Sequence, residues 1–253
     1  MRDFIKNILY AFLYAARSAA DFLFNFREVS VLCYHSISSD GWELSTSPEM
    51  FERQLRFLKA HGYHFAALDE ISAYAKREGS LLRKCAAVTF DDGYEDLLTH
   101  ALPILRKYQA SAAVFLIAEP EAAGSYLKPG AKMLGEAQLA ELAASGLITL
   151  AHHSKTHAML ETTGAETLSR EIANPKGYRY FAYPGGHYSA EVARAVAKAG
   201  FTAAFSIKPG LIAPGDDLFA LKRNVITGPM PFWQFALRAT KAIEWYRSIV
   251  RAF

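Results

Sequence analysis

Short apolar runs alternate with amphipathic stretches along most of this chain, from about residue 28 to residue 228. Eight of the runs have the length of strands and are rich in β-branched or aromatic residues. They begin at Val29, Tyr63, Cys85, Ala112, Leu147, Tyr180, Ala203 and Phe219. Strands that alternate with helices in this way are typical of a parallel sheet or barrel surrounded by helices.

The stretches between the runs have the period of helices. Ser47 followed by Pro48 is typical of a helix start, so we expect a helix over Glu49–Ala60 that ends before Gly62. The same period predicts helices over Asp69–Lys76, Tyr94–Tyr108, Glu136–Ser145, Thr167–Ile172 and Ala190–Ala199. Together these elements predict a single α/β domain with enough strands to close a barrel.

Both ends of the chain carry amphipathic segments instead. We expect an N-terminal helix over residues 1–27, the α/β domain over 28–228 and a basic, aromatic-rich helix over 229–253. Each helix could pack on the domain or lie on a membrane surface, and the Arg, Lys and aromatic residues suit the second role. Lys6, Arg17 and Asp21 interrupt the first segment, so it does not read as a spanning helix. The lack of a clear signal peptide favours the cytoplasmic face of a membrane.

Composition narrows the range of partners and leaves the redox compartment open. The net charge is only +3, and no dense block of Lys or Arg forms a stripe that could follow phosphates. We therefore do not expect a nucleic-acid partner. Cys33 and Cys85 each lie in an apolar run, where buried thiols are usual, although the sequence does not exclude a disulfide.

Two adjacent carboxylates, Asp91 and Asp92, directly follow the run that begins at Cys85, and Gly93 allows a sharp turn after them. In α/β folds, residues at the carboxyl ends of strands meet at the functional face. Two like charges raise each other's pKa unless a cation compensates them. Asp-Asp-Gly is also a common turn, so the pair needs a partner elsewhere in the chain.

His153 and His157 supply that partner, because they follow the run that begins at Leu147 and lie four residues apart. If a helical turn carries them, both imidazoles can bind one ion. Two nitrogens and one carboxylate oxygen form the ligand set of a catalytic zinc, with the fourth position left for water. Such an ion lowers the pKa of the water and polarises a carbonyl group, which suits amide hydrolysis.

A third motif, Phe181-Ala182-Tyr183-Pro184-Gly185-Gly186, follows another predicted strand. Proline and paired glycines expose backbone N–H groups that can form an oxyanion hole. With these three motifs in this order, the chain resembles the NodB-type polysaccharide deacetylases, carbohydrate esterase family four, from about Val29 to Ile226. The resemblance implies a distorted (β/α) barrel of about seven strands, with fewer regular strands than eight.

The resemblance also implies residue roles: Asp91 as general base, Asp92, His153 and His157 as metal ligands, and Tyr183, Pro184 and Gly185 around the oxyanion. Two positions depart from the family. Ala182 stands where many members have an arginine that orients the catalytic aspartate, and Leu221-Lys222-Arg223 stands where others have a Leu-x-His that supplies the general acid. His35, after the first strand, is our candidate for the missing acid, ahead of His187.

The resemblance therefore implies a metal-dependent hydrolase that removes an N-acetyl or other N-acyl group from an amino sugar. Asp91 would be the base and metal-bound water the nucleophile. The expected cofactor is one divalent ion, Zn²⁺ first, with Co²⁺ or Ni²⁺ as alternatives. The expected partners are an N-acetylated polysaccharide or glycolipid and a membrane surface. The two departures leave an alternative, a carbohydrate-binding protein on the same fold that has weak or no activity.

Overall fold

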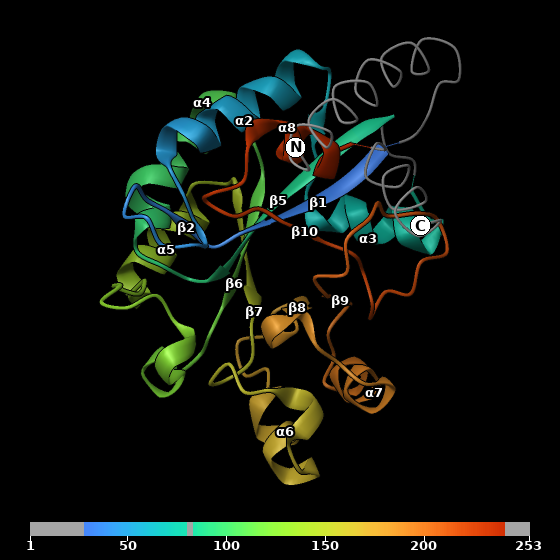
Figure 1. Cartoon of the computed structure of the whole chain (residues 1–253). Coiled ribbons are helices and arrows are strands. Elements are labelled where there is room, and N and C mark those ends of the chain that lie inside the picture. The colour runs from blue at the N-terminus through green and yellow to red at the C-terminus, as the bar shows by residue number, and fades with distance from the viewer. Residues whose placement is uncertain (1–27, 80–82, 241–253) are drawn as a thin grey trace, which may run out of the picture.

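The computed structural model describes residues 28–79 and 83–240, so the predicted N-terminal helix and most of the predicted C-terminal helix lie outside it. The strands of its main sheet follow the order β10-β1-β5-β6-β7-β8-β9, and the short strand β4 also pairs with β5 (Figure 1). All of these pairings are parallel. The strands are β1 Glu28–Tyr34, β4 His64–Phe65, β5 Lys84–Asp92, β6 Ala112–Leu116, β7 Ile148–His152, β8 Tyr180–Ala182, β9 Ala203–Phe205 and β10 Asn224–Val225. The path of seven strands confirms the predicted distorted barrel.

Helices surround this sheet in Figure 1, at the places where the sequence predicts them. They are α2 Pro48–Ala60, α3 Leu68–Lys76, α4 Leu102–Tyr108, α5 Glu136–Ala144, α6 Ala165–Glu171, α7 Ala190–Lys198 and α8 Phe232–Arg238. Ser47 caps α2 as predicted, since its hydroxyl accepts a hydrogen bond from Met50 N at 3.2 Å. Single helical turns occur at Leu97–Ala101, Pro120–Ala122, Gly124–Tyr126, Leu160–Thr162 and Pro184–Gly186.

The structure corrects two element predictions. The helix expected over Tyr94–Tyr108 begins only at Leu97, because Tyr94 is held in a bridge to Met133. The strand expected from Phe219 shortens to Asn224–Val225. Leu221 pairs with Phe205 of β9, whereas Asn224 pairs with Leu32 of β1, so this segment crosses from one edge of the sheet to the other. A two-residue pair at Ser36–Ile37 (β2) and Ser45–Thr46 (β3) was not predicted.

Side chains of the central strand β5 alternate between two cores, as the pleat of a strand requires. Ala86, Val88 and Phe90 pack in the core that also holds residues of α2 and α4. Cys85 and Ala87 pack in the core that also holds residues of α3. By the same alternation Thr89 and Asp91 belong to the second set, so the strand delivers Asp91 to the inner side of the curved sheet.

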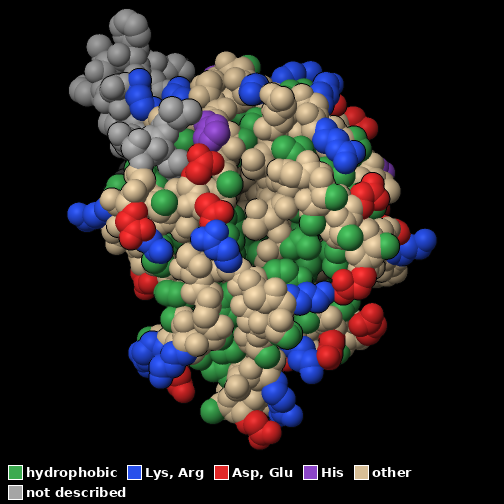
Figure 2. Space-filling view, turned by 180° about the vertical axis from the view of Figure 1, so that it is seen from behind, with side chains coloured by type: hydrophobic (Ala, Val, Ile, Leu, Met, Phe, Trp, Pro, Cys, Tyr) green, Lys and Arg blue, Asp and Glu red, His purple; other side chains and the backbone are tan. Residues whose placement is uncertain are grey.

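The part of the C-terminal amphipathic stripe that the structure describes packs on the domain. The rings of Phe232 and Phe235 in α8 lie 5.4 and 6.2 Å from the ring of Phe57 in α2. Phe235 and Ala239 are fully buried. Within residues 28–79 and 83–240, no helix combines the length and hydropathy needed to cross a bilayer. On the face seen in Figure 2, acidic and basic side chains are interspersed.

Candidate active site

Two segments that are about 60 residues apart in sequence meet at the carboxyl ends of the central strands. Asp92 ends β5, and His153 directly follows β7, where its N–H donates to Leu116 O of β6 at 2.8 Å. His153 Nε2 lies 3.6 Å from Asp92 Oδ1, and His157 Nε2 lies 3.9 Å from the same oxygen. The ligand atoms of the three residues all lie within 4.8 Å of one another. The structure thus brings together the three residues that the sequence proposes as metal ligands.

The segment that carries the two histidines is a loop, which corrects the expected helical turn. Ser154 and His157 have positive φ angles of 65° and 60°, and Asp92 has 73°. The left-handed conformation costs free energy for residues with a Cβ, and such residues gather at functional sites. The Ser154 hydroxyl accepts a hydrogen bond from His157 N at 2.9 Å, which fixes the second histidine relative to the first.

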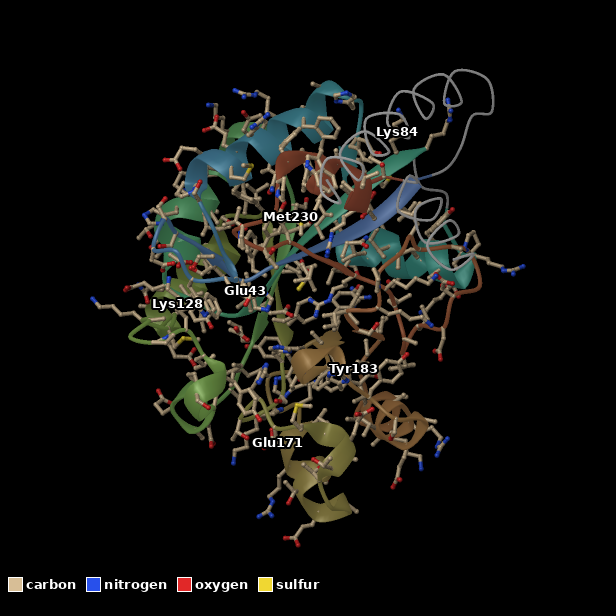
Figure 3. The ribbon with its side chains drawn as sticks, in the orientation of Figure 1. Glu43, Lys84, Lys128, Glu171, Tyr183 and Met230 are labelled. Atoms are coloured by element: carbon tan, nitrogen blue, oxygen red, sulfur yellow. The ribbon has the colours of Figure 1, made fainter. Side chains whose placement is uncertain are left out.

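Glu171, the last residue of α6, also holds this loop in place (Figure 3). The sequence did not predict this contact. Its carboxylate accepts hydrogen bonds from the backbone N–H of Lys155 at 3.1 Å and of Thr156 at 2.9 Å. The Thr156 hydroxyl donates a third at 2.7 Å. Glu171 is 5% exposed, so these donors satisfy a buried carboxylate. Its position in an amphipathic helix gave no signal of this contact.

The donor set fits a divalent cation. His153 Nδ1 hydrogen-bonds to Ala182 O at 2.8 Å, which leaves Nε2 for a ligand. Asp92 Oδ1, the oxygen that both imidazole Nε2 atoms approach, is buried and has no hydrogen-bond partner among the described residues. Buried polar atoms are nearly always paired in proteins, so an unpaired carboxylate oxygen at a cluster of ligand types indicates a missing partner. Two imidazole nitrogens and a carboxylate oxygen suit zinc in particular.

The two aspartates have opposite protonation tendencies. Burial and the neighbouring charge of Asp91 raise the pKa of Asp92 to about 7. Burial acts in the same direction on Asp91, but the charge and hydrogen bonds of Arg223 outweigh it and hold the pKa of Asp91 well below its usual range. Asp91 is therefore ionised at neutral pH. Asp92 needs a cation beside it to be fully charged there, which is consistent with its place in the ligand set.

Burial also keeps the histidines of the site uncharged. It lowers the pKa of His153 to about 3, against the opposing effect of Asp91, and it lowers the pKa of His157. Neutral imidazole is the form that binds metal ions.

Arg223 binds Asp91, a contact that the sequence did not predict. Its guanidinium is fully buried and donates to Asp91 through Nη1 at 2.6 Å and Nη2 at 2.8 Å. Nε donates to Ser206 O at 3.1 Å, so the plane of the group is fixed. Ala182 stands where many family members have an arginine, and here the charge comes from the segment that crosses between the sheet edges. The signal in the sequence was an arginine within an apolar run, at the position where other members have the histidine of Leu-x-His.

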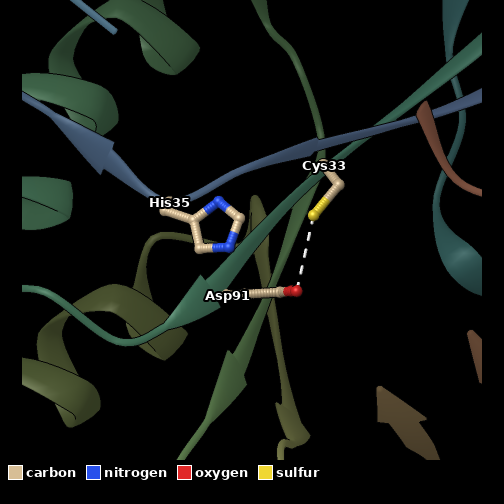
Figure 4. Close-up of side chains that lie close together, drawn as sticks. All are labelled: Cys33, His35 and Asp91. Carbon is tan, nitrogen blue, oxygen red and sulfur yellow. Dashed lines mark hydrogen bonds between the residues drawn. The ribbon is translucent and has the colours of Figure 1, made fainter. Parts of the chain in front are cut away.

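Cys33 near the end of β1 and His35 just after it lie close to Asp91 (Figure 4). Strand β1 flanks β5 on the side away from β6 and β7. The ligand atoms of Cys33, His35 and Asp91 are within 4.8 Å of one another, and the Cys33 thiol donates to Asp91 Oδ2 at 3.4 Å. Burial lowers the pKa of His35 to about 4, although Asp91 opposes it. Burial raises the pKa of Cys33, so it remains a thiol. Neither cysteine of the chain forms a disulfide.

The turn after β8 presents backbone to the surface. Pro184 is buried, and the Tyr183 side chain is fully buried with its hydroxyl donating to Phe219 O at 2.8 Å. Gly185 is exposed and has a φ angle of 61°. A Cβ on Gly186 would lie 2.8 Å from Ile207 N, so the next position also requires glycine. Tyr183 and Pro184 therefore shape this turn, and the group it exposes is the backbone at Gly185.

The polysaccharide deacetylase family model matches residues 78–204, which is half of the chain. The chain belongs to the polysaccharide deacetylase family. The matched span includes Asp91, Asp92, His153 and His157 and the Pro-Gly-Gly turn. It includes neither His35 nor Arg223. The NodB-type fold and the family that the motifs imply are thereby confirmed.

Known members of this deacetylase family align with most of the chain. YxkH of Bacillus subtilis, which carries the family's name, is 29% identical over 205 residues, 78% of this chain and 70% of that protein. A poly-β-1,6-N-acetyl-D-glucosamine N-deacetylase of Staphylococcus epidermidis is 26% identical over 200 residues, 72% of this chain and 68% of that protein. The deacetylase PplD of Streptococcus pyogenes has the same fold, with a TM-score of 0.73, 24% identity and coverage of 84% of this chain and 98% of that one.

Proposed function

We propose that this deacetylase-family chain is a metal-dependent hydrolase that removes an N-acetyl, or other N-acyl, group from an amino sugar in a polysaccharide or lipid-linked glycan. The observation that carries the proposal is the arrangement around Asp91. An ionised carboxylate, fixed by Arg223, lies 3.9 Å from the nitrogen of His153 that belongs to the ligand set. A base held beside three ligands for one cation suits metal-dependent hydrolysis of an amide.

Asp92, His153 and His157 would hold the cation, with zinc first and cobalt or nickel as alternatives. A divalent ion supplies two effects there when it is bound: it lowers the pKa of water and polarises the acyl carbonyl. The second contact of His153, to Ala182 O, orients its ring for that role.

Asp91 acts as the general base. Arg223 keeps it ionised, and the bidentate contact prevents rotation of the carboxylate. Oδ2 is the oxygen nearer the ligand set, since it lies 3.9 Å from His153 Nε2. A proton taken from water at this oxygen would weaken the pairing with Arg223, so the proton is readily given up in a later step.

The leaving amine needs a proton, and His35 is the group proposed to deliver it. His35 is neutral at pH 7 because burial lowers its pKa to about 4, so it cannot begin as the acid. The pKa of Asp91 is lower still, which favours transfer of the proton from Asp91 to His35 and then to the amine. His35 Nδ1 is buried and has no hydrogen-bond partner among the described residues.

The backbone at Gly185 is the proposed donor to the oxyanion that forms on the acyl carbon. Buried Tyr183 and Pro184 fix the turn, and the missing side chain at Gly185 leaves its N–H accessible. A preorganised backbone donor of this kind costs no rearrangement during the reaction.

The substrate class follows from the relatives. The S. epidermidis protein is named as an N-deacetylase of poly-β-1,6-N-acetyl-D-glucosamine, and we propose an N-acetylglucosamine glycan of this type for the present chain. The alternative, a binding protein without activity, was motivated by two departures from the family: the missing arginine at Ala182 and the missing histidine of Leu-x-His. Arg223 argues against the first, because it supplies an arginine to Asp91 that Ala182 does not.

We also propose peripheral attachment to a membrane, through the predicted amphipathic segment 1–27 and the basic end of the chain. Serine at Ile5, Leu9 and Phe12 should release the protein from anionic vesicles in a flotation assay. A control with serine at Asp3, Asn7 and Asp21 keeps the apolar stripe and should still float. Wild-type protein that never floats would remove this part of the proposal.

The function is tested first by metal content and turnover. Wild-type protein purified without a metal-binding tag should hold about one ion per chain by elemental analysis. Asp92→Ala, His153→Ala and His157→Ala should lose it, whereas His187→Ala, which changes an exposed histidine, should keep it. Wild type should release acetate from N-acetylglucosamine oligomers, and Asp91→Asn should not. Zinc-supplemented wild type that holds no more metal than the ligand variants would overturn the proposal.

A further inference from the structure

Among the described residues, two large hydrophobic side chains are exposed, and both lie at the site. They are Tyr126, which is 59% exposed, and Ile207, which is 37% exposed. The ring of Tyr126 lies 5.5 Å from the ring of the proposed ligand His157. Ile207 lies against Gly186 in the turn that exposes the Gly185 backbone. Single exposed apolar side chains are normal on a protein surface, but here both border the same site.

The loop that carries Tyr126 is fixed by a largely buried lysine, Lys128, whose side chain is 14% exposed (Figure 3). Its backbone N–H donates to the hydroxyl of Tyr94 at 3.1 Å. Its ammonium group donates to Ser36 Oγ at 2.9 Å, pairs with Asp40 and lies 3.6 Å from Asp96. Burial of a cation is favourable only with such partners. The exposed ring of Tyr126 is thus held on an ordered loop.

The same lysine links this loop to a second aromatic residue at the site. Asp40, its ion-pair partner, also accepts a hydrogen bond from the backbone N–H of Trp42 at 3.0 Å. The ring of Trp42 packs edge-on against His35 at 6.4 Å and against Tyr94 at 5.7 Å. Trp42 is partly exposed. One aromatic side chain therefore lies beside the proposed metal ligand His157, and another beside the proposed proton carrier His35.

We infer that Tyr126 and Trp42 form a sugar-binding subsite for a pyranose ring next to the residue that loses its acyl group. The inference rests on the proposed function and adds the polymer as the preferred substrate form. Aromatic faces pack on the C–H faces of sugar rings, and the hydroxyl groups stay available to polar neighbours. Rings held in place before binding lose little conformational entropy when the ligand arrives.

The test compares Tyr126→Ala with wild type on two substrates: the β-1,6-linked N-acetylglucosamine pentasaccharide and the methyl glycoside of N-acetylglucosamine. The ratio of kcat/KM for the pentasaccharide to that for the monosaccharide should fall about tenfold, through KM, because an aromatic anchor is lost. Tyr126→Phe should keep the wild-type ratio, since it keeps the ring. Tyr108→Ala removes a partly exposed tyrosine of α4 and should also keep it.

Binding is measured separately, by saturation-transfer NMR with zinc-loaded Asp91→Asn and the pentasaccharide, so that this inference does not depend on turnover. Binding that Tyr126→Ala weakens, in a protein with no deacetylase activity, would keep the subsite and overturn the proposed function. An unchanged ratio and unchanged binding in Tyr126→Ala would overturn the subsite. So would an effect of Tyr126→Ala on flotation with vesicles alone, which would make the ring a membrane contact.

Discussion

Arg223 donates two hydrogen bonds to Asp91, from Nη1 to Oδ1 at 2.6 Å and from Nη2 to Oδ2 at 2.8 Å, across 132 positions of sequence. Both side chains are almost completely buried, at 0% and 4% exposure. An ion pair in such a place is stabilising only relative to its broken form, because each charge alone would be left without solvent or partner. The proposed base and this arginine therefore depend on each other.

Removing the arginine should destabilise the protein and change the pH profile. We expect Arg223→Met to lower the free energy of unfolding by about 3–5 kcal/mol in urea titrations at pH 7, because the Asp91 charge is left buried and unpaired. The pKa of Asp91 should rise, which shifts the acid limb of kcat/KM to higher pH. The double variant Asp91→Asn/Arg223→Met should recover part of the lost stability. A double variant as unstable as the sum of both single variants would contradict the pairing.

Metal binding should release a proton from Asp92 at acidic pH. The pKa of Asp92 is raised to about 7 without a cation, so the carboxyl is mostly protonated at pH 6 and must ionise when the metal binds. Calorimetric titration with zinc at pH 6, in buffers of different ionisation enthalpy, should report close to one proton released per ion. At pH 8 the release should be near zero, since Asp92 is already ionised.

The raised pKa of Asp92 also determines how the stability of the metal-free protein depends on pH. Because the folded pKa of Asp92 lies above the unfolded value, the metal-free fold binds more protons than the unfolded chain between about pH 4 and 7. The contribution of Asp92 to the free energy of unfolding therefore falls as pH rises through this window. Asp92→Asn should lack this slope in urea unfolding of the metal-free protein. A slope in Asp92→Asn equal to that of wild type would assign it to another group.

Loosening the histidine loop should weaken metal binding without touching a ligand. Glu171→Gln replaces a carboxylate that accepts three hydrogen bonds from Lys155 and Thr156 with an amide that matches them less well. We expect zinc affinity, measured by competition with a chelator, to fall about 10–100-fold. The control Glu166→Gln changes a residue of the same helix that is 87% exposed and pairs with Arg170 of that helix. It should leave the affinity at the wild-type value.

The close approach at the Pro-Gly-Gly turn should make Gly186 irreplaceable. A Cβ there would meet Ile207, and the φ angle of 74° also disfavours any other residue. Gly200→Ala is a matched control, since it has a φ angle of 90° but open space around the added Cβ. We expect Gly186→Ala to destabilise the fold by about 1–3 kcal/mol more than Gly200→Ala, by thermal or urea unfolding. It should also lower kcat, because the turn that exposes Gly185 must shift.

The sequence by itself determined the class of fold and the candidate site residues. The alternation of apolar runs and amphipathic stretches depends on local periodicity, which is why strands and helices such as β5 and α2 were predicted close to their observed bounds. Asp91, Asp92, His153 and His157 could be proposed because each follows a predicted strand, and parallel strands place their carboxyl ends at one edge.

Only the tertiary structure decided which residues support these groups. Arg223 reaches Asp91 because the segment from Leu221 to Asn224 crosses between the two edges of the curved sheet, a path that no local period records. Glu171 contacts the histidine loop because α6 ends beneath it, and Lys128 joins the loops of Tyr126 and Trp42 through Asp40. Periodicity arises from neighbours along the chain, whereas these contacts depend on how the whole sheet curls. Short motifs therefore determined the candidate site residues, and only folding decided which side chains support them.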